Sequence, residues 1–527
     1  MYFMVLRDDT INQQLLIPLD LRDLIPKDHP CFFIKNVVDT MDFTEIHKKY
    51  EGKPGESAYS RAMLLRVTLM GAFDGGLSSR ELEEQVNTNI AYMYLAGMQK
   101  PDFRTFARFK QHNGDLINQA FIKSIEIARE ADLIKLHKIA FDGTKIKAKS
   151  SLNNITDKEQ LKILKDNLKR SIELDEEEDE LFGDESGNSV PNSLINKKEF
   201  QKISEKIDQK SKNDRNQEKL RASSKKLLKK ASKSKKDAEQ VLNQIDNLEQ
   251  KLDESGKDII SISDSDARLM INKKGRWEFC YNYQIGVDAE NGLIVSTGLT
   301  QNPADFNELQ PQIEKLESIV GPLAPNTQIL ADNGYSTDEA TDFLEQKSLD
   351  GYIASRKLAR KDKNLINVDK PFSKDHFTYS VEKGTYICPL GQILENQNEY
   401  KIRENKRKIV YWSNNCKNCP KQLECVGKYR YRTITDYGTP SKIRMQRKME
   451  EDWAQEIYSL RSQVAELPFA DLKHNIKFNE FTTTGLERCD TELKLMATGY
   501  NFKRIFNEIN KKSNHKRLKK RVFLNFF

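Results

Sequence analysis

The chain lacks a long apolar run and a leader-like start, and each absence excludes a class of protein. No stretch approaches the ~18 consecutive apolar residues of a membrane-spanning helix. The first residues, MYFMVLRDDT, lack the positive segment followed by an apolar one that marks a signal peptide. We therefore expect a cytoplasmic protein. Hydrophobic residues make up only 37% of the 527, and charged residues 31%, which predicts several domains with long solvated segments.

Cysteine is scarce, but it is clustered. Seven cysteines are present, and four of them fall between positions 388 and 425. In a reducing compartment such a cluster indicates a metal site rather than disulfides. A Cys-x2-Cys pair with two further thiolates would complete a tetrahedral structural Zn2+ site, and the alternative is four reduced thiols in a small β insertion. The four residues are Cys388, Cys416, Cys419 and Cys425.

The net charge of +7 is unevenly distributed along the chain. Residues 210–236 hold twelve Lys or Arg against two acids, and residues 502–527 hold nine against one. Residues 173–185 instead hold nine carboxylates. Basic blocks fit a polyanionic partner, because Lys and Arg release counterions from phosphate chains. The alternative is a set of solvated helix faces.

The first 130 residues predict helices separated by glycine and proline breaks. Ser78 stands three residues before Glu81, which is the spacing of a capping box at a helix start. Residues 103–110 interleave phenylalanines with cations, which fits a helix on DNA and also fits an amphipathic helix covering a core. These residues are Phe103, Phe106 and Phe109 with Arg104, Arg108 and Lys110.

From residue 131 the hydrophobic period becomes that of strands. Residues 131–150 predict a strand, a turn at Asp142–Gly143 and a second strand. Residues 262–374 continue with a hairpin at Asn291-Gly292, and the mixture of strands and helices favours a mixed α/β sheet. Residues 375–437 predict a Cys-rich β insertion, residues 438–510 return to helix, and residues 511–527 form a basic tail.

The segment between the two stretches of strands, residues 151–261, is charged and nearly free of aromatic residues. Val241, Ile245, Leu248 and Leu252 recur at spacings of 4, 3 and 4, which is a short heptad-like stripe. We expect an inserted pair of long helices, or coiled coil, here. Two interpretations fit these charges. Either the acidic and basic halves pair with each other, or the basic half clamps DNA.

Asp142 and Asp332 each follow an apolar segment and precede a glycine turn. This predicts two carboxylates at the ends of neighbouring strands, where they would hold hard, oxygen-loving cations. Two such ions roughly 3.5–4 Å apart are a recurrent device of phosphoryl transfer, a reaction that needs little covalent help from the protein. The alternative is that each Asp is an ordinary turn residue.

A third acid is predicted in EIYSLRSQVAELPFADLKHNIK. Glu466 and Lys473 would share a face of one continuous helix. Glu466 would complete the metal site, while Arg461 and Lys473 would bind phosphates. Pro468 predicts that Glu466 lies at or before the first turn of its helix, because proline is tolerated only there. Glu492 is the alternative third acid, and an amphipathic helix with surface charges is the alternative to both.

Together these motifs resemble the bacterial insertion-sequence transposases of the DDE class. The resemblance rests on IAFDGTKIKAKS around the first Asp, DSDARLM before the hairpin YNYQIGVDAENGLIV, and ILADNGYS around the second Asp. Their Tyr-Arg-Glu-Lys signature is matched by Tyr458, Arg461, Glu466 and Lys473, although four residues rather than the commonest three separate Arg and Glu. The helices before residue 130 are also similar, so the resemblance covers most of the chain apart from residues 151–261.

The resemblance implies an α/β fold with an RNase H-like mixed-sheet core, completed by residues 438–510. An N-terminal all-helical DNA-binding domain (1–130) would precede that core. The charged helical insertion (151–261) and the small Cys-rich β insertion (375–437) would interrupt it.

The resemblance also implies a reaction on double-stranded DNA. The enzyme would bind the terminal inverted repeats of its insertion sequence, cleave there and transfer strands to target DNA. A homodimer would bring two ends together, in the cytoplasm and associated with the bacterial nucleoid. The implied catalytic residues are Asp142, Asp332 and Glu466, which would hold two Mg2+ or Mn2+ ions, and the implied phosphate-binding residues are Tyr458, Arg461 and Lys473.

Two alternatives share these motifs. One is a DNA-binding protein that derives from such an enzyme and has lost catalysis. The other is a structure-specific nuclease of the same fold, which would cut DNA without joining strands.

Overall fold

The computed structural model describes residues 20–44, 48, 58–182, 220–232, 234–272, 275–354, 371–403 and 406–513. The chain divides into two compact units. Unit 1 combines Met1–Ile134 with Leu493–Phe527, and unit 2 is Lys135–Glu492. Among the helices of the described residues, none is both long and apolar enough to cross a membrane.

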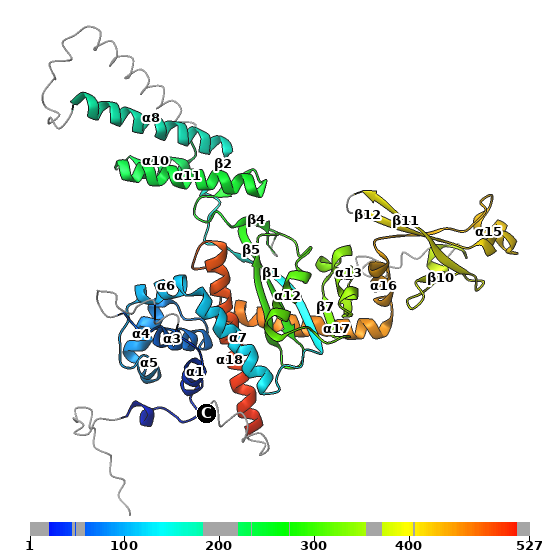
Figure 1. Ribbon diagram of the computed structural model, residues 1–527, viewed down its shortest axis with the longest axis horizontal. Coiled ribbons are helices and arrows are strands. Elements are labelled where there is room, and N and C mark those ends of the chain that lie inside the picture. The colour runs from blue at the N-terminus through cyan, green and yellow to red at the C-terminus, as the bar shows by residue number, and fades with distance from the viewer. Residues whose placement is uncertain are drawn as a thin grey trace, which may run out of the picture. The chain divides into compact units, whose positions relative to one another are not determined.

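Unit 1 is helical, as its sequence predicts (Figure 1). Its central helix is α3, in which ten of thirteen residues are buried. The predicted capping box is confirmed, because the Ser78 hydroxyl accepts from the Glu81 amide while the Glu81 carboxylate accepts from the Ser78 amide. The helices are α1 (Pro30–Asp39), α3 (Arg61–Phe73), α4 (Ser79–Thr88), α5 (Ile90–Leu95), α6 (Phe103–His112), α7 (Gly114–Glu130) and, from Leu493 onward, α18 (Leu486–Ser513), with a short 3-10 turn, η1 (Leu21–Leu24).

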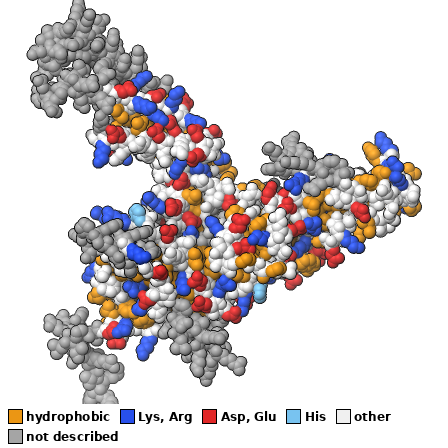
Figure 2. Space-filling view, in the orientation of Figure 1, with side chains coloured by type: hydrophobic (Ala, Val, Ile, Leu, Met, Phe, Trp, Pro, Cys, Tyr) orange, Lys and Arg blue, Asp and Glu red, His pale blue; other side chains and the backbone are white. Residues whose placement is uncertain are grey.

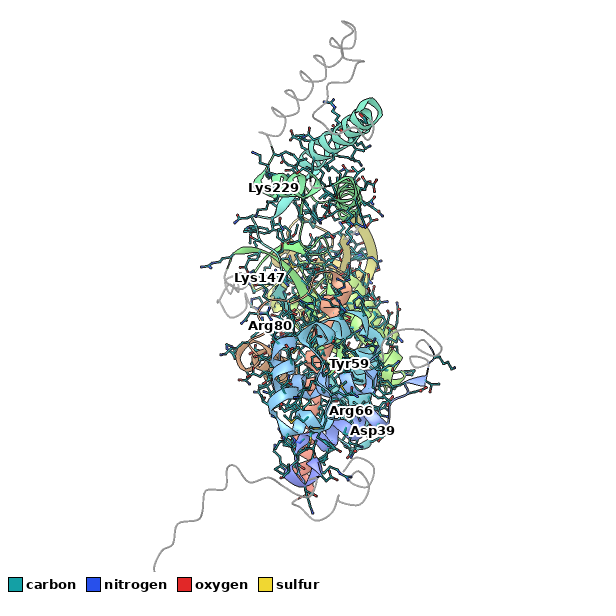
Figure 3. All side chains as sticks on the ribbon, turned by 90° about the vertical axis from the view of Figure 1, so that its left-hand side faces the viewer. Asp39, Tyr59, Arg66, Arg80, Lys147 and Lys229 are labelled. Atoms are coloured by element: carbon teal, nitrogen blue, oxygen red, sulfur yellow. The ribbon has the colours of Figure 1, made fainter. Side chains whose placement is uncertain are left out.

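The end of the chain completes the core of unit 1. A Cβ on Gly499 of α18 would lie 2.5 Å from the backbone of Ala72 on α3, so the two helices touch closely there. The ring of Phe33 on α1 meets that of Phe502 edge-on at 5.5 Å. On the surface, Arg66 of α3 lies 3.5 Å from Asp39 of α1 (Figure 3).

Unit 2 is built on a mixed sheet in which β1 (Lys138–Lys147) is central (Figure 1). β5 (Trp277–Asp288) pairs antiparallel with β1 on one side, and with β4 (Arg268–Ile271) and β6 (Leu293–Thr300) on the other. β7 (Gln328–Ala331) pairs parallel with β1, and β8 (Asp350–Ile353) pairs parallel with β7. β5 is buried from Phe279 to Asp288, as expected of an inner strand.

Helices pack on this sheet through several strands. α12 (Leu309–Val320) contacts β5 and β6, and α13 (Asp338–Gln346) contacts β8. α17 (Asp452–Ala470) contacts β1, β5, β7 and β8. The hairpin predicted at Asn291-Gly292 joins β5 to β6, with Gly292 in the left-handed region at φ 62°.

One local prediction is wrong: the chain does not turn at Asp142–Gly143. β1 runs without interruption through both residues, and Asp142 is paired with Ile285 of β5. The Asp-Gly pair is a turn signal in an exposed hairpin. Here pairing to β5 along the whole strand overrides that preference.

The charged insertion is closed at its base by a two-stranded sheet of β2 (Ile155–Asp157) and β3 (Ile259–Ser261). α8 (Lys158–Phe182), α10 (Ala222–Ala231) and α11 (Lys235–Ser255) pack together. The predicted stripe of Val241, Ile245, Leu248 and Leu252 is buried in their shared core. Lys165 of α8 lies 2.6 Å from both Asp246 and Glu249 of α11. Much of the acidic and basic blocks lies outside the described residues.

The Cys-rich region is a five-stranded antiparallel sheet with its own small core. Asp436 is buried there beside Lys374 and Arg447, so its charge is compensated. α16 (Pro440–Lys448) follows and packs on α13. The strands are β9 (Thr378–Ser380), β10 (Thr385–Ile387), β11 (Ile393–Arg403), β12 (Lys406–Trp412) and β13 (Ile434–Tyr437), with η4 (Lys374–His376), η5 (Asn414–Asn418) and α15 (Gln422–Val426) between them.

The capping box gives a direct test of unit 1. Ser78→Ala removes the acceptor for the Glu81 amide, and we expect a loss of about 1 kcal/mol in the free energy of unfolding. Hydrogen exchange at the Glu81 amide should quicken accordingly. Ser79→Ala, one residue later and inside the helix, is the matched control, and an equal effect of both changes would contradict the assignment.

Candidate active site

Asp142 and Asp332 are brought side by side by the pairing of β1 with β7. These strands are parallel, and Phe141 is the register partner of Ala331. The next residue on each strand is an aspartate, so the two carboxylates start from adjacent positions and point to the same face. The flanking residues of both strands are fully buried and fix this register. The sequence prediction that these two acids meet is therefore supported by the strand register.

Backbone amides at the end of β7 hold Asp332 in place. Asp332 is the N-cap of the short helix η3 (Asn333–Tyr335), and its Oδ1 accepts from the Gly334 amide at 2.7 Å. Burial raises the pKa of Asp332 above its usual value, and the neighbouring carboxylate of Asp305 adds to the rise. The site therefore concentrates negative charge in a partly buried place, where a cation would stabilise it.

Asp305 is a carboxylate at this site that the sequence analysis missed. Its Oδ1 accepts from the side-chain amides of Asn282, at 2.8 Å, and Gln284, at 2.6 Å, both on β5. A Cβ on Gly143 would come within 2.5 Å of Asp305 Oδ1, and one on Gly334 within 3.0 Å of its Oδ2. Asp305 thus lies against the face of β1 opposite Asp142, and reaches Asp332 at the end of β7.

A signal for Asp305 was present in the sequence. Asn282 and Gln284 are alternate, amide-bearing residues in an otherwise apolar strand, and buried amides require partners. Residues 305–321 have a helical hydrophobic pattern, in which Asp305 is simply the first residue. In the structure α12 begins at Leu309, and Asp305 lies in the preceding turn.

Helix α17 covers the Asp142 face of the sheet. Arg461 Nη1 lies 3.3 Å from Asp142 Oδ2, and the ring of Phe469 meets Tyr283 of β5 edge-on at 5.9 Å. The guanidinium of Arg461 also lies 5.7 Å from the ring centre of Tyr458, one turn earlier. Burial lowers the pKa of Arg461, but Tyr458 and the two aspartates outweigh it and raise the pKa overall.

Two buried donor atoms of Arg461, Nε and Nη1, make no hydrogen bond to any described residue. Among these residues, Nη1 has only its ion-pair contact with Asp142. Buried donors are normally satisfied, so two such groups beside a carboxylate pair indicate a ligand with acceptor oxygens. Arginine presents its donors as a planar fork that matches a phosphate.

Lys473 anchors the other end of the same segment. Its Nζ donates to Thr144 Oγ1 at 2.5 Å, and Thr144 lies two residues after Asp142 on β1. Lys473 belongs to a π-helical turn, η6 (Asp471–Asn475), which continues α17. The contacts of Arg461 and Lys473 with β1 therefore lie on either side of Glu466 in sequence, and they hold this segment over one face of β1.

The expectation for Pro468 is wrong. Pro468 lies inside α17, near its end, and Glu466 is in the fourth turn rather than the first. Proline removes one backbone donor, and the chain changes to a π-helix three residues later, where hydrogen bonds skip an additional residue. Glu466 and Lys473 consequently do not lie on one uniform α-helix.

The two candidate third acids differ in their surroundings. Glu466 is exposed on α17. Glu492 is engaged by the loop before α18, because its carboxylate accepts from the amides and hydroxyls of Thr482 and Thr483. These bonds give Glu492 a structural role in holding that loop, which favours Glu466 as the functional acid.

The acids of the DSDARLM stretch also have structural partners. Asp264 is buried and accepts from the Tyr281 hydroxyl and the Gly485 amide. Asp266 accepts from Lys251 and from the Leu486 amide at the start of α18. This stretch thus fastens the sheet to the beginning of the last helix.

The predicted zinc site is not found. The four cysteines line one small cavity, together with apolar groups such as Phe377 and Leu394. Burial raises the pKa of Cys425, which has the other three thiols as neighbours. Within the part of the chain that the structure describes, no three His, Cys, Asp or Glu side chains are placed to hold a metal ion. That finding covers the carboxylates as well as the thiols.

Arg461 supplies the positive charge beside Asp142, and the effect of removing it is measurable. Arg461→Gln removes the cation beside the carboxylates, so we expect a lower thermal midpoint in EDTA because like charges then repel. Added Mg2+ should raise that midpoint more than it raises the wild-type midpoint, because ligand binding to the folded state stabilises it. Thermal unfolding with and without Mg2+ measures both.

Arg444→Gln is the control for that experiment. Arg444 pairs with Glu345 at 2.5 Å, as a surface ion pair away from these aspartates. Its variant should respond to Mg2+ as the wild type does. If Mg2+ raised the thermal midpoints of the Arg461 and Arg444 variants equally, Arg461 would not lie beside a cation site.

Comparison with known proteins gives two family matches. Residues 19–112 match the family described as Transposase domain (DUF772), and residues 387–506 match the family described as Transposase DDE domain. No curated protein and no solved structure matches the chain. The second match includes Glu466 and Lys473, while Asp142 and Asp332 lie outside both. Enzymes of the DDE class generally use divalent metal ions. These two domains on one chain support its identification as an insertion-sequence DDE transposase.

Proposed function

We propose that this transposase binds the terminal inverted repeats of its insertion sequence, and cleaves and joins DNA strands there by a DDE mechanism. The observation that carries the proposal is the register of β1 and β7, which starts two aspartates from adjacent positions. The strand order, with an antiparallel hairpin on one side of β1 and parallel strands on the other, is that expected of an RNase H-like core.

Asp142, Asp332 and Glu466 would hold divalent metal ions, Mg2+ or Mn2+. Their oxygen ligands are of the kind that these hard cations prefer. Support for Glu466 comes from the two contacts of Arg461 and Lys473 with β1, which hold its helix over the Asp142 face. Such ions activate the attacking oxygen and stabilise the leaving oxygen in phosphoryl transfer.

The protein's own part is to hold the DNA phosphate and orient it. Toward the described residues, the Nε of Arg461 makes no hydrogen bond and its Nη1 has only the ion-pair contact with Asp142, so the two donors fit phosphate oxygens beside Asp142. The ring of Tyr458 supports the guanidinium, and Lys473 supplies a second cation along the same face. Water would first break a strand at the element's end and leave a 3′-hydroxyl. This hydroxyl would then attack a phosphorus of the target strand and displace the target's own 3′-oxygen.

End recognition is assigned to unit 1. On α6, Phe106 and Phe109 are buried in the core, whereas Arg104 and Arg108 are exposed. Arg80 of α4 lies over the Phe103 ring at 5.3 Å and adds a third exposed cation (Figure 3). The buried rings agree with an amphipathic helix that covers a core, and the exposed cations of the opposite face support the proposed DNA contact. A homodimer would bring two ends of the element together. We also predict that the protein acts in the cytoplasm, associated with the nucleoid.

The decisive experiment is strand transfer with the element's own ends and Mg2+. Asp142→Asn, Asp332→Asn and Glu466→Gln should each lower cleavage and joining at least about 100-fold, since loss of even outer-shell partners costs up to about that much. Binding of the ends should persist in all three. Glu456→Gln, an exposed acid on the same helix, is the control for Glu466 and should stay active.

Each failure has a distinct meaning. Activity in the Asp332→Asn variant would refute the metal-site assignment. Full activity in Glu466→Gln alone would remove Glu466 from the site. A wild type that binds the ends and neither cuts nor joins them would identify a DNA-binding derivative without catalysis, and cutting without joining would identify a nuclease.

The α6 surface gives a separate prediction about affinity. Arg104→Gln with Arg108→Gln should weaken binding to the inverted repeats and lower the salt dependence of log K by about 2, at roughly one per phosphate contact. Fluorescence anisotropy over a range of salt concentrations measures both. Lys123→Gln with Arg129→Gln on α7 should change neither, and an equal effect of both pairs would move recognition away from α6.

A further inference from the structure

The end of β12 and the chain that leads to β13 carry a group of neighbouring rings and cations. The rings of Trp412 and Tyr431 lie 4.6 Å apart and are tilted by 35°. Lys417 and Arg430 lie over the Tyr431 ring at 5.6 and 5.4 Å. Blue and orange side chains gather around the position of α15 (Figure 2).

A second ring extends this group into solvent. Tyr429 is 68% exposed, and Lys428 lies 6.0 Å from its ring centre. An exposed tyrosine that buries little of its surface contributes little to folding. We refer to these six residues as the aromatic-basic patch: Trp412, Lys417, Lys428, Tyr429, Arg430 and Tyr431.

The patch is not part of the small core of the β region. That core consists of other side chains, from Phe377 to Ile443, and neither Trp412 nor Tyr431 belongs to it. The rings therefore hold the cations in place at the surface, because a cation over a ring face is attracted to it.

The charge of the patch is not balanced locally. Lys417, Lys428 and Arg430 are exposed, and no described carboxylate forms an ion pair with any of them. Two nearby carboxylates, Glu424 and Asp436, pair with other lysines. Glu424 pairs with Lys421 at 2.6 Å, and Asp436 is buried with Lys374.

Three unbalanced cations beside one exposed ring and two partly exposed rings are the chemistry of a nucleic-acid surface, since cations bind phosphates and rings contact sugars and bases. We propose that the aromatic-basic patch is a second DNA-contacting surface, distinct from α6, which binds the DNA backbone without regard to sequence. The choice of DNA over another polyanion rests on the proposed function, because DNA is the substrate of a transposase.

The test measures binding of full-length protein to a duplex of random sequence. Lys417→Gln, Lys428→Gln and Arg430→Gln are combined in one variant, and fluorescence anisotropy is recorded over a range of salt concentrations. The plot of log K against log salt has a negative slope, and we expect its magnitude to decrease by about 3, at roughly one per phosphate contact. Affinity should fall at least about tenfold at moderate salt, equally for random duplex and for inverted repeats.

The matched control removes the same charge elsewhere. Lys257→Gln, Lys315→Gln and Lys383→Gln change three exposed cations outside the patch, and should leave the slope unchanged. Tyr429→Ala should weaken binding while Tyr429→Phe retains it. Far-UV circular dichroism and thermal unfolding verify that the patch variant is folded.

The outcomes separate this proposal from that for the active site. An unchanged slope in the patch variant would overturn the DNA surface even if the wild type joins strands. Equal slope changes in the patch variant and its control would show only the effect of net charge, and would also overturn it. A lower slope in a protein that never cuts or joins DNA would support the patch while refuting the catalytic proposal.

Discussion

The parallel pairing of β1 with β7 is the constraint on which the candidate active site depends. Because Phe141 is opposite Ala331, the residues that follow are aspartates on adjacent strands. A shift of one residue would send one carboxylate to the opposite face, since side chains alternate along a strand. The buried residues Ile139 to Phe141 and Ile329 to Ala331 prevent that shift, so apolar packing positions the two charges.

The electrostatics of the site are consistent with this arrangement. Asp332 is partly buried and lies close to Asp305, while Asp142 starts from the adjacent position on β1. Arg461 supplies the positive charge on the Asp142 side, and the two amides of Asn282 and Gln284 satisfy one oxygen of Asp305. The folded chain thus tolerates three neighbouring carboxylates because each has a different source of compensation.

Local features of this fold could be predicted from sequence, and features created by long-range pairing could not. The capping box at Ser78 and the hairpin at Asn291-Gly292 are determined by residues a few positions apart, and both are confirmed. The Asp-Gly pair at 142 suggested a turn because its strand partners, β5 and β7, are more than 130 residues away in sequence.

The candidate site shows the same division. The pairing of two aspartates was predicted, because each follows a short apolar segment. Asp305 was missed, because it acquires its role only through the amides of Asn282 and Gln284 on β5. The position of Glu466 within its helix was predicted wrongly, because the rule for proline ignores the π-helical turn that follows Pro468.

The packing of α18 in unit 1 has a consequence for how the protein is synthesised. Gly499 and Phe502 complete a core whose other members, Ala72 and Phe33, are translated more than 400 residues earlier. The first helices therefore leave the ribosome with an open apolar face, which cannot close until α18 has been translated. A nascent or truncated chain without α18 lacks a finished unit 1, so only a chain that includes this helix presents the α6 surface on an intact scaffold.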